Sequence, residues 1–231
     1  MITVETIQER HSVREYDGGP LSRAEFDALI AVVEECARES GLDIQLVGDN
    51  PEVFNVIARF GLIRGCRTHV AFVVDDAKAG DVAADEAIGY WGQKIVLAAQ
   101  DMGLNTCWCA LCSRKKSRAV VAPGKKIRLV IAVGHGKTQG FSRKTKSVEA
   151  LSSAECAKSP AWFAAAMEAA QLAPTAMNNQ NFKITLLSDG KTVRIDAPQS
   201  GLNVIDEGIV RCNFEIAANE AGADWRWERD I

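Results

Sequence analysis

The sequence predicts an α+β fold, and three observations support this prediction. Long helices are expected at 85–101, where apolar residues recur at steps of three and four, and at 203–220. Strands are expected at short apolar runs, namely 44–47, 69–74, 127–133, 182–187 and 192–196. The last two runs flank a turn that contains Asp189 and Gly190, which is the pattern of a β-hairpin.

The first third of the chain carries clear helix signals. A short helix is expected at 4–10, ahead of a polar run. Ser22 is a candidate N-cap, and Glu25 three residues later completes a capping box. The helix that they open should end at Gly41, because glycine is the usual residue after a helix C-terminus. The segment 53–63, between the first two strands, is also expected to be helical.

The middle of the chain alternates helical and extended segments. Gly103 should end the helix at 85–101, and an apolar piece at 104–112 follows it. After the strand at 127–133 comes a basic loop at 136–146. Pro160 is well placed in the first turn of a further helix, which should end before Pro174.

Composition narrows the class of protein. The chain has 231 residues, of which 47% are hydrophobic and 25% charged, and its net charge is −3. The composition is typical of a soluble globular protein. The net charge gives no excess of basic residues with which to bind nucleic acid or an anionic membrane. No apolar stretch is long enough to cross a bilayer, and the start lacks the apolar region of a signal peptide. Seven cysteines, an odd number, indicate free thiols, so we expect a cytoplasmic protein.

Two stretches of the chain resemble each other. Residues 97–103, with Trp108 five positions past the glycine, match 216–222, with Trp227 five positions past its glycine. Each stretch also has a glycine at the same distance upstream, namely Gly89 and Gly208. Coincidence is one interpretation, since Ala-Ala pairs and terminal glycines are common in helices. The shared register favours a degenerate internal duplication.

A cluster of cations and a hydroxyl follows the first predicted helix. Arg10, His11, Ser12 and Arg14 lie within five consecutive residues. Guanidinium groups bind phosphate bidentately, and a serine hydroxyl adds a donor, so the cluster suits a terminal phosphate. Taken alone, the same residues are also typical of a solvated charged turn.

A second candidate site lies where the helix before Pro174 ends. Pro174, Thr175 and Ala176 are small enough to let a flat ring approach the backbone, and Asn178 and Gln180 follow them. Amide side chains both donate and accept hydrogen bonds, as the edge of a flavin or pyrimidine requires. The alternative is an ordinary helix-to-strand turn whose amides satisfy backbone groups.

Two more segments complete a recognisable set. Residues 103–110 read Gly-Leu-Asn-Thr-Cys-Trp-Cys-Ala, and 134–136 read Gly-His-Gly with Arg143 and Lys144 downstream. Together with Arg-His-Ser-Val-Arg at 10–14 and Ala-Pro-Thr-Ala-Met-Asn-Asn-Gln at 173–180, they resemble the nitroreductase family of FMN enzymes. The resemblance covers nearly the whole chain. It implies a nitroreductase-like α/β sandwich, with a central, largely antiparallel or mixed sheet flanked by helices.

The order of these motifs is similar to a duplicated branch of the family. In ordinary nitroreductases the Ala-Pro-Ser motif follows soon after the arginine cluster, and the opposite subunit of a homodimer supplies it to the flavin. Here it lies beyond residue 170 of the same chain. The resemblance therefore implies two related halves, 1–150 and 151–231, that imitate the dimer. One complete site can be assembled, so we expect one FMN per chain. A monomer is sufficient, and a homodimer stays open.

The resemblance also implies roles for individual residues. Arg10 and Ser12, with Arg143 or Lys144, would hold the phosphate and ribityl end, and Arg14 would support the reduced flavin at N1 and O2. The ring would pack on and bond to Pro174, Thr175, Ala176 and Asn178, in the segment 174–180 that we call the Pro174 loop. A backbone N–H near 108–110 would address N5. The implied cofactor-binding set is Arg10, His11, Ser12, Arg14, Trp108, Cys109, Ala110, Arg143, Lys144, Pro174, Thr175, Ala176, Asn178 and Gln180.

The activity implied is an FMN-dependent oxidoreductase. NADH or NADPH would pass two electrons through flavin N5 to a small organic acceptor, of the nitroaromatic or quinone type, by ping-pong hydride transfer. No catalytic side chain is required, because the cofactor carries the chemistry. The chain departs from the family pattern at Asn105, Asn181 and Phe182. The alternative is a flavin carrier or a non-catalytic relative.

Other kinds of site are less well supported by the sequence. Cys107, Cys109 and Cys112 form Cys-x-Cys-x-x-Cys, which is compatible with a metal or iron–sulfur site, but no fourth ligand lies at suitable spacing. The three histidines are far apart, so we expect no metal. The chain has no Gly-x-Gly-x-x-Gly after a strand and no Gly-x-Ser-x-Gly, which disfavours a dinucleotide fold and an ordinary hydrolase.

Overall fold

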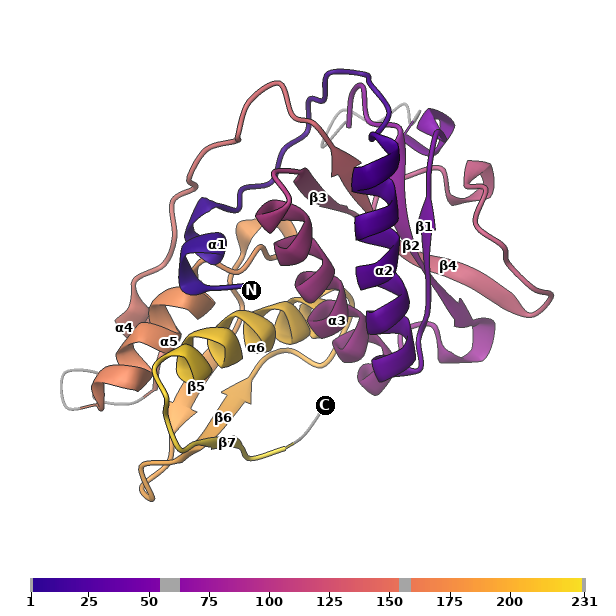
Figure 1. Cartoon of the computed structure of the whole chain (residues 1–231). Coiled ribbons are helices and arrows are strands. Elements are labelled where there is room, and N and C mark those ends of the chain that lie inside the picture. Colours follow the sequence, from indigo (N-terminus) through magenta and orange to yellow (C-terminus); the bar gives the residue numbers. More distant parts are fainter. Residues whose placement is uncertain (1, 55–62, 154–158, 230–231) are drawn as a thin grey trace. The chain divides into compact units, whose positions relative to one another are not determined.

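The computed structural model describes residues 2–54, 63–153 and 159–229 (Figure 1). The chain divides into two compact units. The four-stranded unit comprises residues 10–79 and 94–142, and the three-stranded unit comprises 1–9, 80–93 and 143–231. Because neither unit is continuous in sequence, this division does not test the predicted halves 1–150 and 151–231, which stay a prediction.

The four-stranded unit is built on one antiparallel sheet with the strand order β1-β2-β4-β3. Its strands are β1 (Asp43–Val47), β2 (Thr68–Asp75), β3 (Asn105–Cys109) and β4 (Lys125–Gly134). Nearly every residue of the two central strands, β2 and β4, is buried, so they form the core of this unit. The three strands predicted in this region are confirmed, and β3 falls within the apolar piece predicted at 104–112.

Helix α2 (Arg23–Ser40) packs against β1 and begins and ends as its sequence predicts (Figure 1). Ser22 accepts a hydrogen bond from the Glu25 backbone, and the Glu25 side chain accepts one from the Ser22 backbone. Gly41 takes the left-handed conformation, with φ of 69°, just past the last turn. The helix buries Leu29 and Val33 because they lie on one face.

Helix α3 (Val82–Asp101) is continuous and contains the predicted helix 85–101. Its residues 82–93 belong to the three-stranded unit and the remainder to the four-stranded unit. Gly103 follows it with φ of 76°, a left-handed conformation that glycine adopts without steric cost. The chain then enters β3 two residues later.

The three-stranded unit contains the predicted hairpin. Strand β5 (Lys183–Leu186) pairs antiparallel with β6 (Thr192–Asp196), which confirms it. A strand that the sequence did not predict, β7 (Arg226–Trp227), adds to β6 in parallel. Trp227 therefore lies on a strand after a helix and a glycine, as Trp108 does on β3.

Four helices accompany this small sheet: α1 (Val4–Glu9), α4 (Val148–Leu151), α5 (Ala161–Gln171) and α6 (Asn203–Glu220). Helices α5 and α6 pack together, with Phe163 and Phe214 fully buried and their ring centroids 5.7 Å apart. Pro160 is the N-cap of α5. The predicted helices at 4–10, before Pro174 and at 203–220 are thus confirmed.

The segment predicted as a helix at 53–63 differs from the prediction where it is described. A 3-10 turn, η1 (Pro51–Phe54), covers its beginning, and Ile63 is not helical. The remainder, 55–62, lies outside the described residues. Among the helices that the structure does describe, none has both the length and the apolar character of a membrane span.

Candidate functional site

The arginine cluster runs beside strand β3 in the four-stranded unit. Ser12 forms a parallel bridge with Thr106, and the Val13 N–H donates to the Thr106 carbonyl at 3.0 Å. Backbone pairing therefore fixes the cluster against the strand that carries Trp108. No described residue hydrogen-bonds the side chains of Ser12 or Arg14.

Arg10 is the member of this cluster that most needs a partner. Its side chain is only 8% exposed, and its Nε is buried with no hydrogen-bond partner. Burial removes water from the guanidinium and lowers the pKa of Arg10 to about 10. No described carboxylate forms an ion pair with it. A buried cation is costly unless it is paired, so Arg10 is suited to bind an anion.

His11 links the cluster to the basic loop. Its Nε2 lies 3.1 Å from the Ser142 hydroxyl, and Arg143 is the next residue in the chain. Gly140 lies close to the cluster as well, since a side chain there would come within 2.7 Å of the His11 Cβ. The start of the loop is thereby anchored to the cluster within one unit.

Strand β3 presents a half-buried tryptophan. The Trp108 ring stacks on Phe72 with an interplanar angle of 12° and a centroid distance of 6.2 Å. Cys109 ends the strand and is buried, and Ala110 follows it at a bend. Trp108, Cys109 and Ala110 are thus presented together by one strand end.

Asn105 has a positioning role that the sequence did not predict. It is buried, and its Oδ1 accepts a hydrogen bond from the Gly136 N–H at 2.8 Å. Its Nδ2 donates to the Gln139 side chain at 2.8 Å. The residue that departs from the family pattern therefore holds the Gly-His-Gly loop. The departure from the family pattern at position 105 is the sequence feature that could have indicated this role.

The Pro174 loop of the three-stranded unit has an uncommon backbone. Met177, Asn178 and Gln180 have φ values of 52°, 58° and 46°, all in the left-handed region that non-glycine residues seldom adopt. Met177 is 93% exposed, so no burial of its side chain accounts for this conformation. Left-handed residues of this kind cluster at ligand sites, where surrounding contacts enforce them.

Gln180 is the residue that enforces the conformation of this loop. It is 2% exposed, its Oε1 accepts from the Lys146 N–H at 2.7 Å, and its Nε2 donates to the Gln171 carbonyl at 2.8 Å. Its own N–H donates to the Thr175 hydroxyl at 3.0 Å. Both ends of the amide bond other residues of this unit, so these contacts fix the loop, and a contact between Gln180 and the cofactor stays a prediction.

Asn178 joins the loop to the basic segment. Its Nδ2 donates to the Lys144 carbonyl at 2.8 Å, and the Lys146 ammonium donates to the Gln180 carbonyl at 2.9 Å. The side chains of Arg143 and Lys144 remain exposed. Two of the predicted segments, 143–144 and 174–180, are therefore brought together in the three-stranded unit.

Asp206 is a further residue at this loop that sequence reasoning missed. Both of its carboxylate oxygens lie 3.0 Å from the Ala176 N–H, which donates to them. Burial raises the pKa of Asp206 from 3.8 to about 7, against the opposing effect of the Ala176 hydrogen bond. The sequence feature that could have indicated Asp206 is its place in the first turn of a predicted helix. Acidic residues are common at helix N-termini, so this place alone does not mark a functional residue.

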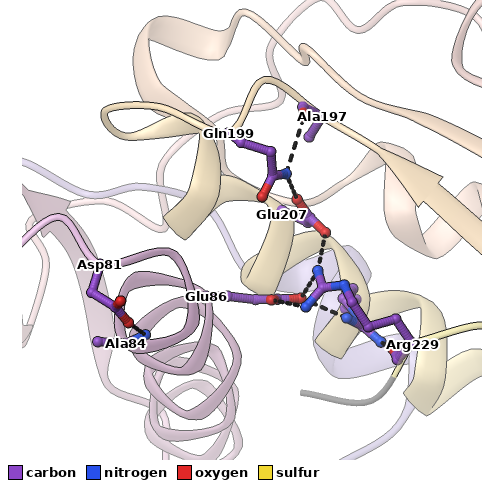
Figure 2. Close-up of polar contacts among 8 residues, drawn as sticks. Asp81, Ala84, Glu86, Ala197, Gln199, Glu207 and Arg229 are labelled. Atoms are coloured by element: carbon purple, nitrogen blue, oxygen red, sulfur yellow. Dashed lines mark hydrogen bonds and ion pairs between the residues drawn. The ribbon is translucent and has the colours of Figure 1, made fainter.

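A separate cluster of charges, in which Glu86, Glu207 and Arg211 are buried and Arg229 is exposed, lies in the three-stranded unit (Figure 2). Glu86 is 1% exposed and bonds both Arg211, at 2.5 Å, and Arg229, at 2.7 Å. Arg229 also bonds Glu207 at 3.0 Å, and Figure 2 shows both carboxylates directed at its guanidinium. A cavity of about 410 Å³ lies beside Arg211 and Trp227. Because these charges neutralise one another, we interpret the cluster as structural.

The cysteines do not form a metal site in the described part of the chain. No group of three or more histidine, cysteine, aspartate or glutamate side chains is arranged there to hold a metal ion. Six described cysteines are free thiols, namely Cys36, Cys66, Cys107, Cys109, Cys112 and Cys212.

Comparison with known proteins identifies relatives. A model of the family described as "Putative TM nitroreductase" matches residues 2–218. The fold matches a "putative nitroreductase" of Thermotoga maritima MSB8 with a TM-score of 0.70 and 19% identity, over 100% of this chain and 90% of that one. It also matches a "putative nitroreductase in complex with FMN" of Desulfovibrio desulfuricans with a TM-score of 0.50 and 19% identity, over 64% and 94%. No curated protein matches the sequence.

The family match spans nearly the whole chain, and the mixed α+β fold with its antiparallel sheets agrees with it. The predicted resemblance and fold class are therefore confirmed. The chain belongs to this family of nitroreductase-like proteins and is an oxidoreductase.

Proposed function

We propose that this protein is an FMN-dependent oxidoreductase that passes two electrons from NADH or NADPH to a small organic acceptor of the nitroaromatic or quinone type. Bound FMN would supply the two-electron relay. The chain's own residues would bind and orient it and hold the charge that develops on it. We place this activity in the cytoplasm, in keeping with the free thiols.

The observation that carries the proposal is the buried side chain of Arg10, whose Nε has no hydrogen-bond partner. A phosphate monoester would bring a negative charge to this site and accept charge-assisted hydrogen bonds from Nε and a terminal nitrogen. Ser12 lies two residues away with a hydroxyl that has no described partner. The residues present therefore fit the phosphate end of FMN.

The Pro174 loop would supply the face of the ring site. Pro174, Thr175 and Ala176 are half-buried, and their small side chains permit close approach of a flat ring. Two hydrogen bonds hold the backbone of this loop. The Gln180 side chain accepts one from the Lys146 N–H, and the Asp206 carboxylate accepts one from the Ala176 N–H. In this proposal Gln180 shapes the loop, and the remaining residues of the predicted set contact FMN.

Arg14, Trp108 and Ala110 complete the proposed site. Arg14, half-buried two residues after Ser12, would stabilise the negative charge on the pyrimidine edge of reduced flavin. The strand end at Trp108–Ala110 would offer a backbone donor toward N5. Arg143 and Lys144, both exposed, would add positive charge near the phosphate.

Phosphate recognition by Arg10 is tested by comparing FMN with riboflavin, which has the same ring but no phosphate. For Arg10→Gln, we expect FMN affinity to fall about 10–100-fold, since a hydrogen bond to a charged group contributes about 1.5–3 kcal/mol. Riboflavin affinity should not change. Flavin fluorescence titration measures both.

Arg23→Ala is the matched control, because Arg23 lies in the same unit, is exposed and pairs with Asp27, its one ion-pair partner among the described residues. It should leave both affinities unchanged. Equal loss of FMN and riboflavin binding in Arg10→Gln would indicate a damaged fold, and no loss of FMN binding would contradict the assignment of Arg10. A second test distinguishes an enzyme from a flavin carrier. In an enzyme, NADH or NADPH should reduce the bound flavin and an acceptor should reoxidise it, whereas a carrier should bind flavin without this cycle.

A further inference from the structure

A cavity of about 410 Å³ lies in the three-stranded unit, beside helix α6 and strands β6 and β7. Its walls include Arg211 from α6, Ile195 from β6 and Trp227 from β7. Arg211 is 1% exposed, whereas the side chain of Arg229, which also lines the cavity, is 55% exposed. The cavity therefore extends from the interior of this unit to its surface. Small-molecule sites have volumes of about 300–1,000 Å³, so it is large enough to hold an organic ligand.

Two N–H groups on the walls of this cavity have no acceptor among the described residues. They are the Nε of Arg211 and the Nε1 of Trp227, and both atoms are buried. Four buried side-chain nitrogens without a partner occur in the described part of the chain, and two of them belong to this one cavity. Because buried donors are almost always satisfied, the pair indicates a ligand that brings acceptor atoms.

The other contacts of Arg211 fix the direction in which its Nε can donate. Its Nη1 donates to the Glu86 carboxylate at 2.5 Å, and its Nη2 donates to the Arg229 carbonyl. The guanidinium lies over the Trp227 ring, with Cζ 4.6 Å from the ring centroid. Both terminal nitrogens are therefore used within the protein. The Nε remains as a donor held beside an aromatic ring.

The arginines that line the cavity already have carboxylate partners. Arg211 and Arg229 bond Glu86, at 2.5 Å and 2.7 Å. Arg194 bonds Glu228 at 2.6 Å, and both of these residues line the cavity. An anionic ligand would add a negative charge without a partner, and a cation would face three guanidinium groups. A ligand that has acceptor atoms and no net charge avoids both costs.

We propose that this cavity binds a small, uncharged aromatic compound that carries a carbonyl group, such as a carboxamide. The carbonyl oxygen has two lone pairs and would accept hydrogen bonds from Arg211 and Trp227. Val193, which is fully buried, and Ile195 give the cavity apolar surface for the aromatic ring. No residue of this wall belongs to the proposed FMN-binding set, so the inference does not depend on flavin binding.

The test uses benzamide as the probe, with benzoate and benzylamine as charged probes of similar size. Benzamide should shift the indole N–H signal of Trp227 in the proton–nitrogen NMR spectrum, and Trp227→Phe identifies that signal by removing it. The signal of Trp108, which does not line the cavity, should not move. Benzoate and benzylamine should bind about tenfold more weakly, because each brings a charge without a partner.

Variants then test the contribution of the indole N–H. Trp227→Phe keeps an aromatic ring and removes the donor, so benzamide affinity should fall about 3–10-fold, the loss expected for one hydrogen bond between neutral groups. Trp225→Phe is the matched control, because Trp225 does not line the cavity and its Nε1 donates to Asn219 at 3.0 Å. Its benzamide affinity should equal that of the wild type. Titrations followed on the benzamide signals measure all three affinities.

A third variant tests the cavity without removing either donor. Ile195→Phe adds volume to the wall, so the folded variant should lose benzamide binding. Saturating FMN should leave benzamide binding to the wild type unchanged. The proposal would be overturned by an unmoved Trp227 signal, by benzoate binding as tightly as benzamide, or by unchanged benzamide affinity in Trp227→Phe or Ile195→Phe. Competition between benzamide and FMN would also overturn it, because the probe would then occupy the flavin site.

Discussion

Gly89 and Gly208 meet where helices α3 and α6 touch within the three-stranded unit. A Cβ placed on Gly89 would lie 3.1 Å from the Gly208 Cα and 2.0 Å from the Ile205 carbonyl oxygen. A Cβ on Gly208 would lie 2.0 Å from the Glu86 carbonyl oxygen. The two backbones are therefore in direct contact. These are the glycines that occupy matching positions in the two similar stretches of sequence.

Gly208→Ala should destabilise the fold by about 2 kcal/mol or more, because the atoms that the new methyl meets are backbone atoms that cannot move aside. Urea unfolding measures this loss. Gly19→Ala is the matched control, since its Cβ would meet only the flexible Asp17 side chain, at 3.3 Å. Equal stability of the two variants would contradict the close helix contact.

Gln180→Ala should cost about 2 kcal/mol, because it removes the partners of the Lys146 N–H and the Gln171 carbonyl together. Asn179→Ala, one residue away and exposed, should change stability by less than about 0.5 kcal/mol. Thermal unfolding of both variants without flavin makes the comparison. A loss of flavin affinity in Gln180→Ala at unchanged stability would instead make Gln180 a cofactor contact.

Asp206 should make stability depend on pH. Its pKa is raised in the folded state to about 7, from 3.8, so folding retains a proton that the unfolded chain releases between these values. This contribution to stability is fully present below pH 3.8 and is lost as pH rises through 7. Asp206→Asn keeps an oxygen to accept from Ala176 and does not ionise.

The difference in melting temperature between Asp206→Asn and the wild type should therefore be small near pH 4 and favour the variant increasingly up to about pH 7. Asp224→Asn, at an exposed carboxylate paired with Lys191, is a suitable control. A constant difference between Asp206→Asn and the wild type across this range would show that the Asp206 pKa is not raised.

Glu86→Gln should destabilise the three-stranded unit by about 3 kcal/mol, because Arg211 is 1% exposed and would be left as a buried charge without its carboxylate. Glu228→Gln breaks an exposed pair with Arg194 and should cost less than about 1 kcal/mol. Denaturant unfolding of both variants measures the contrast. Similar losses would mean that the buried cluster is not held by charge pairing.

Structural features that depend on residues close together in the chain could be predicted from the sequence. The cap at Ser22 and Glu25, the stop at Gly41 and the hairpin around Gly190 involve groups a few positions apart, so local chemistry determines them. Strand β7 was missed because two residues carry no periodicity. Its pairing with β6 brings together residues that are far apart in the sequence, so no local pattern predicts it.

The site was predictable only in part, for the same reason. The motifs identified Arg10 and the Pro174 loop, but the partners of Gln180 and Asp206 lie about 30 residues away and leave no local pattern. Residue type alone does not separate an amide that binds flavin from one that binds backbone, so the backbone contacts of Gln180 could not be predicted from the sequence.

We propose that the arginine cluster and the Pro174 loop bind the same FMN. Calorimetric titration of the flavin-free chain with FMN and with riboflavin tests it, using Arg10→Gln and Ala176→Leu. We predict one FMN per chain, weaker binding of both ligands in Ala176→Leu, and weaker binding of FMN alone in Arg10→Gln. Two FMN per chain, or unchanged binding of both ligands in Ala176→Leu, would contradict the account.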